Sequence, residues 1–433
     1  MTAPARPSRP AAISRTQVRL HHWAAVILLL AYVSGDGVAT AIQATRGWAS
    51  PYPLMVPFLL LAILLMVVDR GRVSVRLVIW ILSLLAFATA VLLAHLNVFR
   101  SVNLAGYGQL WVILLAMFAV QDLVAHASDG MIEAFRRSVR IFHFALAAYL
   151  AISAVVWYTI GLDLGISSLI LRTPTVLSEY YGFRPSGLSR EPAWAGFLLI
   201  STFIAVYVSN PRDRLPAFAA LIVGIASLRS GTAFAFTVIA MAALVLQSRR
   251  HLPFGRSLLI SIGGAFVLIL LVGERASTVL QGADPSGLMR VESGRVAWDV
   301  IRESFPGGVG YGNFRDHAEY GQQFDRWINL DGTDTYKSDI AILNLIAEFG
   351  APGLVIVGVL VALYWRGHHL LLWAHLAAML FLTGGLLIPS NVLVVAVIGF
   401  RERERRLAAA QTRVVSVVPP RRVAPLRHPH VTT

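Results

Sequence analysis

Long apolar runs recur along most of this chain. Hydrophobic residues make up 56% of its 433 residues, and charged residues make up only 14%. A helix of roughly 20 apolar residues crosses the hydrocarbon core of a bilayer, and a helix satisfies its own backbone polar groups there. The pattern therefore predicts an all-α polytopic membrane protein with about 12 transmembrane helices. The predicted spans are residues 23–44, 54–68, 77–98, 104–127, 139–161, 192–208, 215–228, 231–247, 258–272, 339–365, 369–384 and 386–400.

Arginines mark alternate connections between these spans, and this predicts the orientation of the chain. Basic connections face the cytoplasm in membrane proteins, so both termini are expected there. The basic connections on that side are residues 69–76, 128–140, 209–216, 247–256 and 366–369. The net charge of +14 is accordingly assigned to membrane topology and not to nucleic-acid binding.

Three regions follow from this orientation. Residues 1–22 form a basic cytoplasmic tail, residues 23–400 the transmembrane domain, and residues 401–433 a basic, disordered tail that contacts anionic lipid. The first tail resembles the start of a signal peptide. No small-residue cleavage site follows it, so the first span is expected to remain uncleaved.

Two connections on the outer side are long, at residues 162–191 and 273–338. The second is far longer than a plain connector needs, and loops of that length usually carry function. Helical character over residues 288–304 predicts short helices inside this large extracytoplasmic loop. Arg295, Trp298 and Arg302 would share one face of that helix, and Arg295 is spaced to pair with Asp299.

Cationic side chains also stand at three outer membrane boundaries, where topology alone does not require them. Arg184 and Arg190 lie in the first long loop, Arg229 lies in a short turn, and Lys337 lies at the end of the second loop. The spans that follow run from outside to inside, so their N-termini, with unpaired N–H groups and the positive end of the helix dipole, face outward. Guanidinium groups beside helix N-termini favour the binding of phosphate groups.

Composition excludes several other chemistries. The chain has no cysteine, so it forms no disulfide, thiolate metal site or cysteine nucleophile. The glycine run 307–312 lacks the Gly-Lys-Ser/Thr of a nucleotide-binding loop. We interpret the glycines as a tight turn that brings the backbone close to a ligand or to the membrane. The expectation that neither a metal nor a cofactor is needed comes from the family resemblance given below.

Four sequence motifs, in this order, resemble the O-antigen ligase and polymerase superfamily, which includes the Wzy-type polysaccharide polymerases. The resemblance covers residues 182–197, 227–231, 293–314 and 339–353, roughly the second half of the chain. The motifs are Gly187-Leu188-Ser189-Arg190-Glu191-Pro192 before an apolar span, Gly294-Arg295 with an amphipathic helix, Gly308-Val309-Gly310-Tyr311-Gly312-Asn313-Phe314, and Glu348-Phe349-Gly350-Ala351-Pro352-Gly353-Leu354.

The resemblance implies a metal-independent glycosyltransferase in the bacterial inner (cytoplasmic) membrane. Its donor would be an oligosaccharide linked to polyprenyl pyrophosphate, and an acceptor hydroxyl would displace the lipid pyrophosphate at the outer face. Arg190 and Arg229 would hold the pyrophosphate, and Asp339 or Glu348 would accept the proton. The remaining candidates for substrate binding are Arg184, Glu191, Arg295, Gly310, Tyr311 and Lys337.

Within the superfamily, one difference favours a polymerase over a ligase. O-antigen ligases typically carry a His-Asn pair before the Glu-x-Gly segment, whereas this chain has Ser338-Asp339 there. A ligase that transfers the glycan to a lipid or protein acceptor remains an alternative. So does a transporter or flippase of lipid-linked glycans, although no internal repeat or intramembrane line of charges is evident. The implied partners are lipid-linked oligosaccharides, membrane lipid, and possible chain-length regulators or other glycan-assembly proteins, with no nucleic acid.

Structural roles are open for the same residues. Arg184 and Arg190 could pair with Glu179 and Glu191, and Arg229 could lie at the membrane surface as an interfacial cation. Arg295 could pair with Asp299, and Glu348 could be the partner of a buried polar group. The ionisable residues Asp36, His95, Asp122, His126 and His143 in the early spans show no shared spacing, so a proton path through them is not expected.

Overall fold

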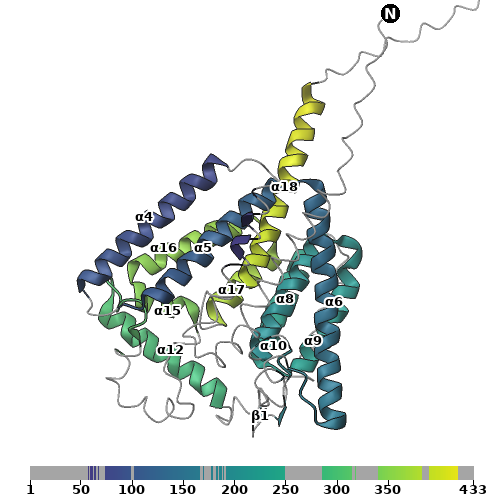
Figure 1. The fold of residues 1–433 in the computed structure, drawn as a ribbon, viewed down its shortest axis with the longest axis horizontal. Coiled ribbons are helices and arrows are strands. Elements are labelled where there is room, and N and C mark those ends of the chain that lie inside the picture. Colours follow the sequence, from purple (N-terminus) through teal and green to yellow (C-terminus); the bar gives the residue numbers. More distant parts are fainter. Residues whose placement is uncertain are drawn as a thin grey trace, which may run out of the picture.

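The computed structural model confirms that the chain is predominantly helical (Figure 1). It describes residues 74–98, 102–165, 192–248, 285–314, 340–382 and 390–417, with scattered positions between 57 and 67 and between 169 and 189, and His317. Within these residues the helices are α4 (Val75–Val98), α5 (Leu104–Ala125), α6 (Asp129–Ile160), α8 (Pro192–Ser209), the short η2 (Pro211–Asp213), α9 (Arg214–Leu228), α10 (Gly231–Ser248), α12 (Pro285–Ser304), α15 (Ala341–Phe349), α16 (Ala351–Trp365), α17 (Leu370–Phe381) and α18 (Ser390–Val417). A small antiparallel pair, β1 (Leu177–Ser178) with β2 (Gly182–Phe183), lies in the first long loop.

Four of the described helices have the length and apolar composition to cross a membrane, namely α4, α5 from Gly106, α6 and α8. The outer surface of α4 carries exposed Val78, Ile79, Leu82 and Leu85. An apolar surface of this kind suits hydrocarbon and not water. The chain is therefore a membrane protein, while the predicted total of about 12 spans and the three predicted regions stay predictions. The predicted spans 23–44 and 258–272 lie outside the described residues.

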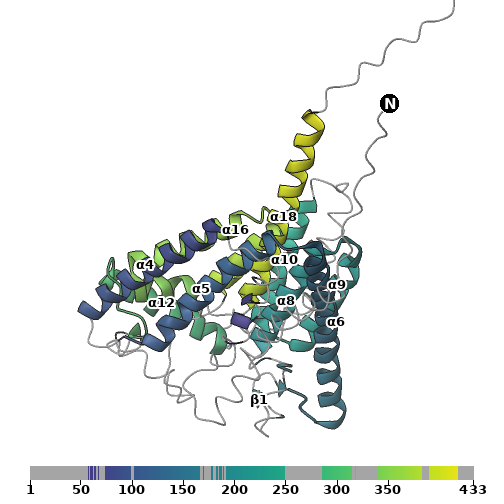
Figure 2. The same cartoon turned by 45° about the horizontal axis from the view of Figure 1, so that its top comes forward.

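Helix α8 lies at the centre of one half of the bundle (Figure 2). It packs against α6, α9, α10, α17 and α18, and its residues are buried almost from end to end. Helices α4, α5, α12, α15 and α16 form the other half, and α18 lies between the two, packed on both α5 and α8. Because α8 has neighbours around its whole circumference, the size of its side chains determines how closely the surrounding helices can pack.

Buried polar contacts fix α8 in place. On one side, Ser201 Oγ lies 3.2 Å from His375 Nε2, and His375 Nδ1 lies 3.0 Å from the Tyr364 hydroxyl. On another side, Thr202 Oγ1 lies 2.9 Å from His143 Nδ1. Each of these side chains is buried and hydrogen-bonded, as buried polar groups must be. They tie α8 to α6 and to α16 and α17.

Three helix boundaries differ from the sequence prediction. Helix α6 begins ten residues before its predicted span, because Ser128 accepts a hydrogen bond from the Met131 N–H and starts the helix inside the basic connection. The predicted single span 339–365 is wrong: it is two helices, separated at Gly350. Helix α18 continues to Val417, through part of the tail expected to be disordered.

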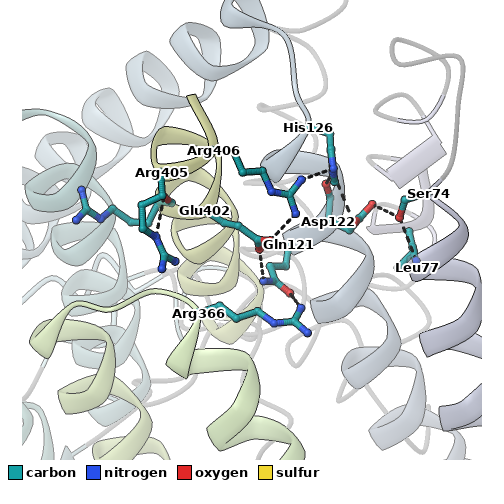
Figure 3. Close-up of polar contacts among 10 residues, drawn as sticks. Ser74, Leu77, Gln121, Asp122, His126, Arg366, Glu402, Arg405 and Arg406 are labelled. Atoms are coloured by element: carbon teal, nitrogen blue, oxygen red, sulfur yellow. Dashed lines mark hydrogen bonds and ion pairs between the residues drawn. The ribbon is translucent and has the colours of Figure 1, made fainter. Parts of the chain in front are cut away.

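A polar network explains why α18 stays helical beyond its apolar part and joins it to α5 (Figure 3). The buried Gln121 side chain donates to Glu402 Oε2 (2.9 Å) and accepts from Arg366 Nη1 (3.1 Å). Glu402 also pairs with Arg406, one helical turn later. Arg406 in turn contacts His126 Nε2, and Ser74 donates to Asp122 (2.8 Å). These contacts join α4, α5, the α16–α17 connection and α18 at one end of the bundle.

That network also places two of the ionisable residues considered for a proton path. Asp122 and His126 belong to it, whereas His143 bonds Thr202 and the Ala217 carbonyl in the centre of the bundle. His95 lies elsewhere, against Phe349. The four described residues therefore lie in three separate places and do not form one continuous line.

The tight contact between α8 and α10 gives a first prediction. A Cβ on Gly196 would lie 2.1 Å from the Ala233 Cβ, whereas one on Gly358, within α16, would meet nothing within 4 Å. We expect Gly196→Ala to overpack the interface and lower stability by about 1–3 kcal/mol. Gly358→Ala should be neutral or stabilising by up to about 1 kcal/mol, since alanine favours a helix. Thermal unfolding in detergent checks this, and equal melting temperatures for the two variants would contradict it.

A second prediction concerns His369, which begins α17. Its Nδ1 accepts a hydrogen bond from the Leu371 N–H (3.3 Å). Burial, followed by the charges of Arg401 and Arg214, lowers the pKa of His369 to about 4. Below the ordinary histidine pKa of about 6.5, the unfolded chain takes up a proton that the folded protein excludes, so stability falls by about 1.4 kcal/mol per pH unit until the folded pKa is reached.

The variant His369→Asn isolates this effect, because asparagine is a good helix cap that does not titrate. Between about pH 7.5 and about pH 5, the melting temperature of the wild type should fall further than that of the variant. If both fall equally, His369 is not the group that titrates.

Candidate functional site

The break between α15 and α16 joins two of the four motifs. Gly350 has φ 65° and ψ −135° and ends the run of intrahelical hydrogen bonds. A helix end leaves carbonyl and N–H groups without intrahelical partners. Here the loop that follows α12 supplies partners: Val309 N donates to Ala347 O (2.9 Å), Gly310 N donates to Glu348 O (2.9 Å), and Ala351 N donates to Pro306 O (2.8 Å). We call this assembly of residues 306–312 with residues 347–351 the loop–break contact.

Side chains are excluded from the centre of this contact. A Cβ on Gly350 would lie 2.0 Å from Pro306 O, and a Cβ on Gly308 would lie 2.5 Å from Gly350 N. Both glycines also have positive φ, which other residues adopt at a cost. The loop and the break can therefore approach only as backbone against backbone.

The Glu348 carboxylate completes the loop–break contact. It is 2% exposed, and its Oε1 accepts a hydrogen bond from Gly312 N (3.1 Å). Its position agrees with the structural role considered for it, as a partner of a buried polar group. A charge-assisted bond to a backbone N–H is stronger than a neutral one, so Glu348 holds the second half of the glycine loop.

Gly310 and Tyr311 lie inside this packing. The Tyr311 carbonyl accepts from Asn103 N (3.1 Å), and its ring is packed on Phe349 and Tyr107, with centroids 5.5 and 6.1 Å away. Both residues are buried. Gly310 and Tyr311 therefore hold the glycine loop in place. Their contact with substrate remains a prediction.

Residues from the first half of the chain support the same assembly, and sequence reasoning did not assign them to it. Asn103 caps α5 through a hydrogen bond from Gly106 N (2.9 Å), and the His95 ring lies 5.9 Å from the Phe349 ring. An asparagine before an apolar helical run is a recognisable cap signal. Nothing in the local sequence indicates that His95 or Tyr107 meets a loop some 200 residues later.

Arg295 stands on the helix that this contact anchors. The inner face of α12, with Ala297, Val300 and Ile301, packs on Val309, Phe314 and Ala347. Arg295 lies on the outer face and is exposed. No ion pair joins it to Asp299 within the described residues, so the structural role proposed for this arginine is not seen here.

Arg229 occupies the turn between α9 and α10. It adopts the left-handed conformation, with φ 48° and ψ 32°, and its exposed side chain donates from Nη1 to the Tyr158 hydroxyl of α6 (2.7 Å). The next residue, Ser230, accepts from Ala233 N (3.4 Å) and so caps α10, which begins at the start of the predicted span 231–247. A guanidinium and the N-terminus of an apolar helix therefore lie side by side.

Helix α8 begins at Pro192, as the sequence predicts. Before it, Ser186 and Ser189 are fully buried, and Ser189 N donates to Ser186 O (2.9 Å) in a tight turn. The candidates Arg184, Arg190, Glu191, Lys337 and Asp339 lie outside the described residues. The hairpin β1–β2, the end of α6 and α12 lie at the end of the molecule opposite the projecting part of α18 (Figures 1 and 2).

In chemical terms, the described part of the site offers cations, helix N–H groups and one buried carboxylate. The cations and the N–H groups can stabilise negative charge that develops on a leaving group, whereas the carboxylate cannot. No group of three His, Asp or Glu side chains that could hold a metal ion occurs among the residues described.

Comparison with known proteins agrees with these motifs. No curated protein matches the chain. Residues 215–358 match the family model described as O-Antigen ligase, and this stretch runs from the start of α9, through the Arg229 turn and the loop–break contact, into α16. These residues therefore form an O-antigen ligase family domain, which confirms the resemblance to the O-antigen ligase/polymerase superfamily.

Proposed function

We propose that the protein polymerises oligosaccharide repeat units carried on polyprenyl pyrophosphate, at the outer face of the bacterial inner membrane, with both of its termini in the cytoplasm. The observation that carries the proposal is the Arg229 turn within the O-antigen ligase domain. It sets an exposed guanidinium beside the capped N-terminus of an apolar helix. A pyrophosphate at the end of a membrane lipid needs an anion site at this level of the membrane.

In the proposed reaction, the acceptor hydroxyl attacks the anomeric carbon of the donor glycan. A new C–O bond forms, the bond from that carbon to the pyrophosphate oxygen breaks, and the lipid pyrophosphate leaves with the electron pair. Arg229 and Arg190 hold its charge as it develops, and in this scheme Lys337 and the helix N-termini contribute further positive charge. Arg184, Glu191 and Arg295 assist in binding the two lipid-linked substrates. No metal is required by this scheme.

For the acceptor proton we favour Asp339 over Glu348. Glu348 is buried and holds Gly312, so proton transfer would compete with its support of the loop. Asp339 stands at the predicted outer boundary, where a sugar hydroxyl can reach it. Glu348 is then a positioning residue for the Gly308–Gly312 loop.

A ligase of the same superfamily is the second candidate, and the description of the matching family favours it. The chain nevertheless has Ser338-Asp339 where the ligases typically have His-Asn. Ligase, polymerase and flippase differ in which glycan species accumulates in a deletion strain, so a single assay separates them.

The first test changes Arg229 to Asn, because asparagine tolerates the left-handed backbone and removes only the guanidinium. A deletion strain complemented with this variant should lose polymer by about 100-fold or more and accumulate single repeat units on the carrier lipid. Tyr158→Phe is the control, since it removes one hydrogen bond and leaves the arginine. Gel analysis of the glycan at matched membrane levels gives the result.

Other glycan patterns contradict the polymerase proposal. Long polymer that remains on its carrier indicates a ligase. Repeat units trapped at the cytoplasmic face indicate a flippase. A normal amount of polymer in the Arg229→Asn strain would show that Arg229 does not bind the pyrophosphate.

A second test separates the two carboxylates. Glu348→Gln keeps an oxygen to accept the Gly312 N–H, so it should retain polymerisation within about tenfold, because only the charge assistance is lost. Glu348→Ala removes the acceptor of the Gly312 N–H and leaves a cavity where the buried Glu348 side chain was, so it should lose both activity and melting temperature. Asp339→Asn should abolish polymer with an unchanged melting temperature. If Glu348→Gln is inactive and stable while Asp339→Asn is active, the roles are reversed.

A further inference from the structure

The outer face of α12 presents its side chains in a definite order. Successive helical residues are separated by about 100° around the axis. The exposed residues form three adjacent stripes, with an aromatic edge, a cationic middle and an acidic edge. These are Trp298 and Phe305, then Arg302 and Arg295, then Asp299 and Glu303. Together they are called the α12 outer face below.

The aromatic edge is open to the surroundings. Trp298 is 55% exposed on α12, whose opposite side is packed, and Phe305 is 50% exposed in the turn directly after the helix. The backbone of Phe305 still follows the helix, because its N–H donates to the Ile301 carbonyl (2.9 Å). Large aromatic side chains left open on a rigid element commonly mark a binding surface.

The helix that carries this face is held rigidly. Ala297, Val300 and Ile301 pack on Val309 and Phe314 of the glycine loop and on Ala347 of α15. That loop is bonded through its backbone to the α15–α16 break. The orientation of the α12 outer face is therefore fixed by the same loop–break contact that positions Glu348.

The charges of the face cancel. Two guanidinium groups and two carboxylates alternate along it, and no ion pair joins them within the part of the chain that the structure describes. The guanidinium N–H groups and the carboxylate oxygens of this face can therefore form hydrogen bonds with a ligand. Because the two signs cancel, the face gains no net attraction to the phosphates of a bilayer surface, so the charge pattern does not favour membrane binding as its role.

We propose that the α12 outer face binds the glycan of the acceptor substrate. A sugar ring has an apolar C–H face and a rim of hydroxyl groups. The first can stack on Trp298 or Phe305, and the second can accept from the arginines and donate to the carboxylates. The inference rests on the proposed function and adds the place where the glycan lies.

Binding of a lipid-free glycan tests this proposal separately from the reaction. The probe is the surface polysaccharide of the same organism, cut into short fragments without lipid, titrated by calorimetry into the full-length protein in nanodiscs. Trp298→Ala should weaken binding by about tenfold, and Trp298→Tyr should recover part of the loss. Trp365→Ala is the control, because Trp365 is 63% exposed on α16, away from the α12 outer face, and should bind as the wild type does.

Arg229→Asn distinguishes a failed inference from a failed function. It should bind the fragments like the wild type while losing polymerisation. Unchanged fragment binding by Trp298→Ala overturns the glycan site, whatever Arg229 does. So does an absence of fragment binding by the wild type.

A lipid measurement gives the remaining outcome. Brominated phospholipid quenches tryptophan fluorescence in the bilayer. If the quenched part of the fluorescence is larger in the wild type than in Trp298→Tyr by the contribution of one tryptophan, Trp298 lies in the bilayer and the proposal is wrong. Equal fractional quenching in the two proteins is the result expected for a face turned to water.

Discussion

Unpaired backbone groups at the end of α15 determine the arrangement of the candidate site. A helix that stops inside a membrane protein leaves carbonyl groups that nothing apolar can satisfy. The Gly308–Gly312 loop supplies N–H donors to two of them, and the Pro306 carbonyl just before that loop accepts from the first N–H of α16. Because these bonds run between main chains, their geometry leaves no room for side chains at Gly350 or Gly308. The position of α12, the burial of Glu348 and the setting of Tyr311 all follow from that one contact.

The sequence predicted the helices where the apolar pattern was strong. Helices α8 and α10 begin at the starts of the predicted spans 192–208 and 231–247, and Pro192 and the Ser230 cap account for these starts because capping preferences act locally. The break at Gly350 was missed although Gly350 and Pro352 are typical boundary residues, since the apolar run around them is continuous. The helical part of the last segment was missed because pairs such as Glu402 with Arg406 and Gln121 with Glu402 outweigh a polar, arginine-rich composition.

The candidate site was predicted as residues but not as an arrangement. Arg229 and Arg295 could be singled out because cations at outer boundaries are exceptional. The pairing of the glycine loop with the Glu348 segment depends on the backbone hydrogen bonds from Val309 to Ala347 and from Gly310 to Glu348, which no local pattern encodes. The supporting roles of Asn103 and Tyr107 depend on still longer separations. Residue type alone also could not predict that Glu348 is buried. Its burial changes its proposed role from the base that accepts the proton to a residue that positions the glycine loop.

The position of α18 has a consequence for biosynthesis. This helix packs between the two halves of the bundle. Its Glu402 accepts a hydrogen bond from Gln121, 281 residues earlier in the chain, and its Arg403 donates to Asp129, 274 residues earlier. The ribosome therefore completes α5, α6 and α8 long before their partner exists. Until α18 arrives, the surfaces it will cover must face lipid or a chaperone, and the buried amide of Gln121 has neither Glu402 nor Arg366 beside it. Assembly of this protein in the membrane is thus completed by its most C-terminal helix in the described structure, and not by successive docking of each helix as it emerges.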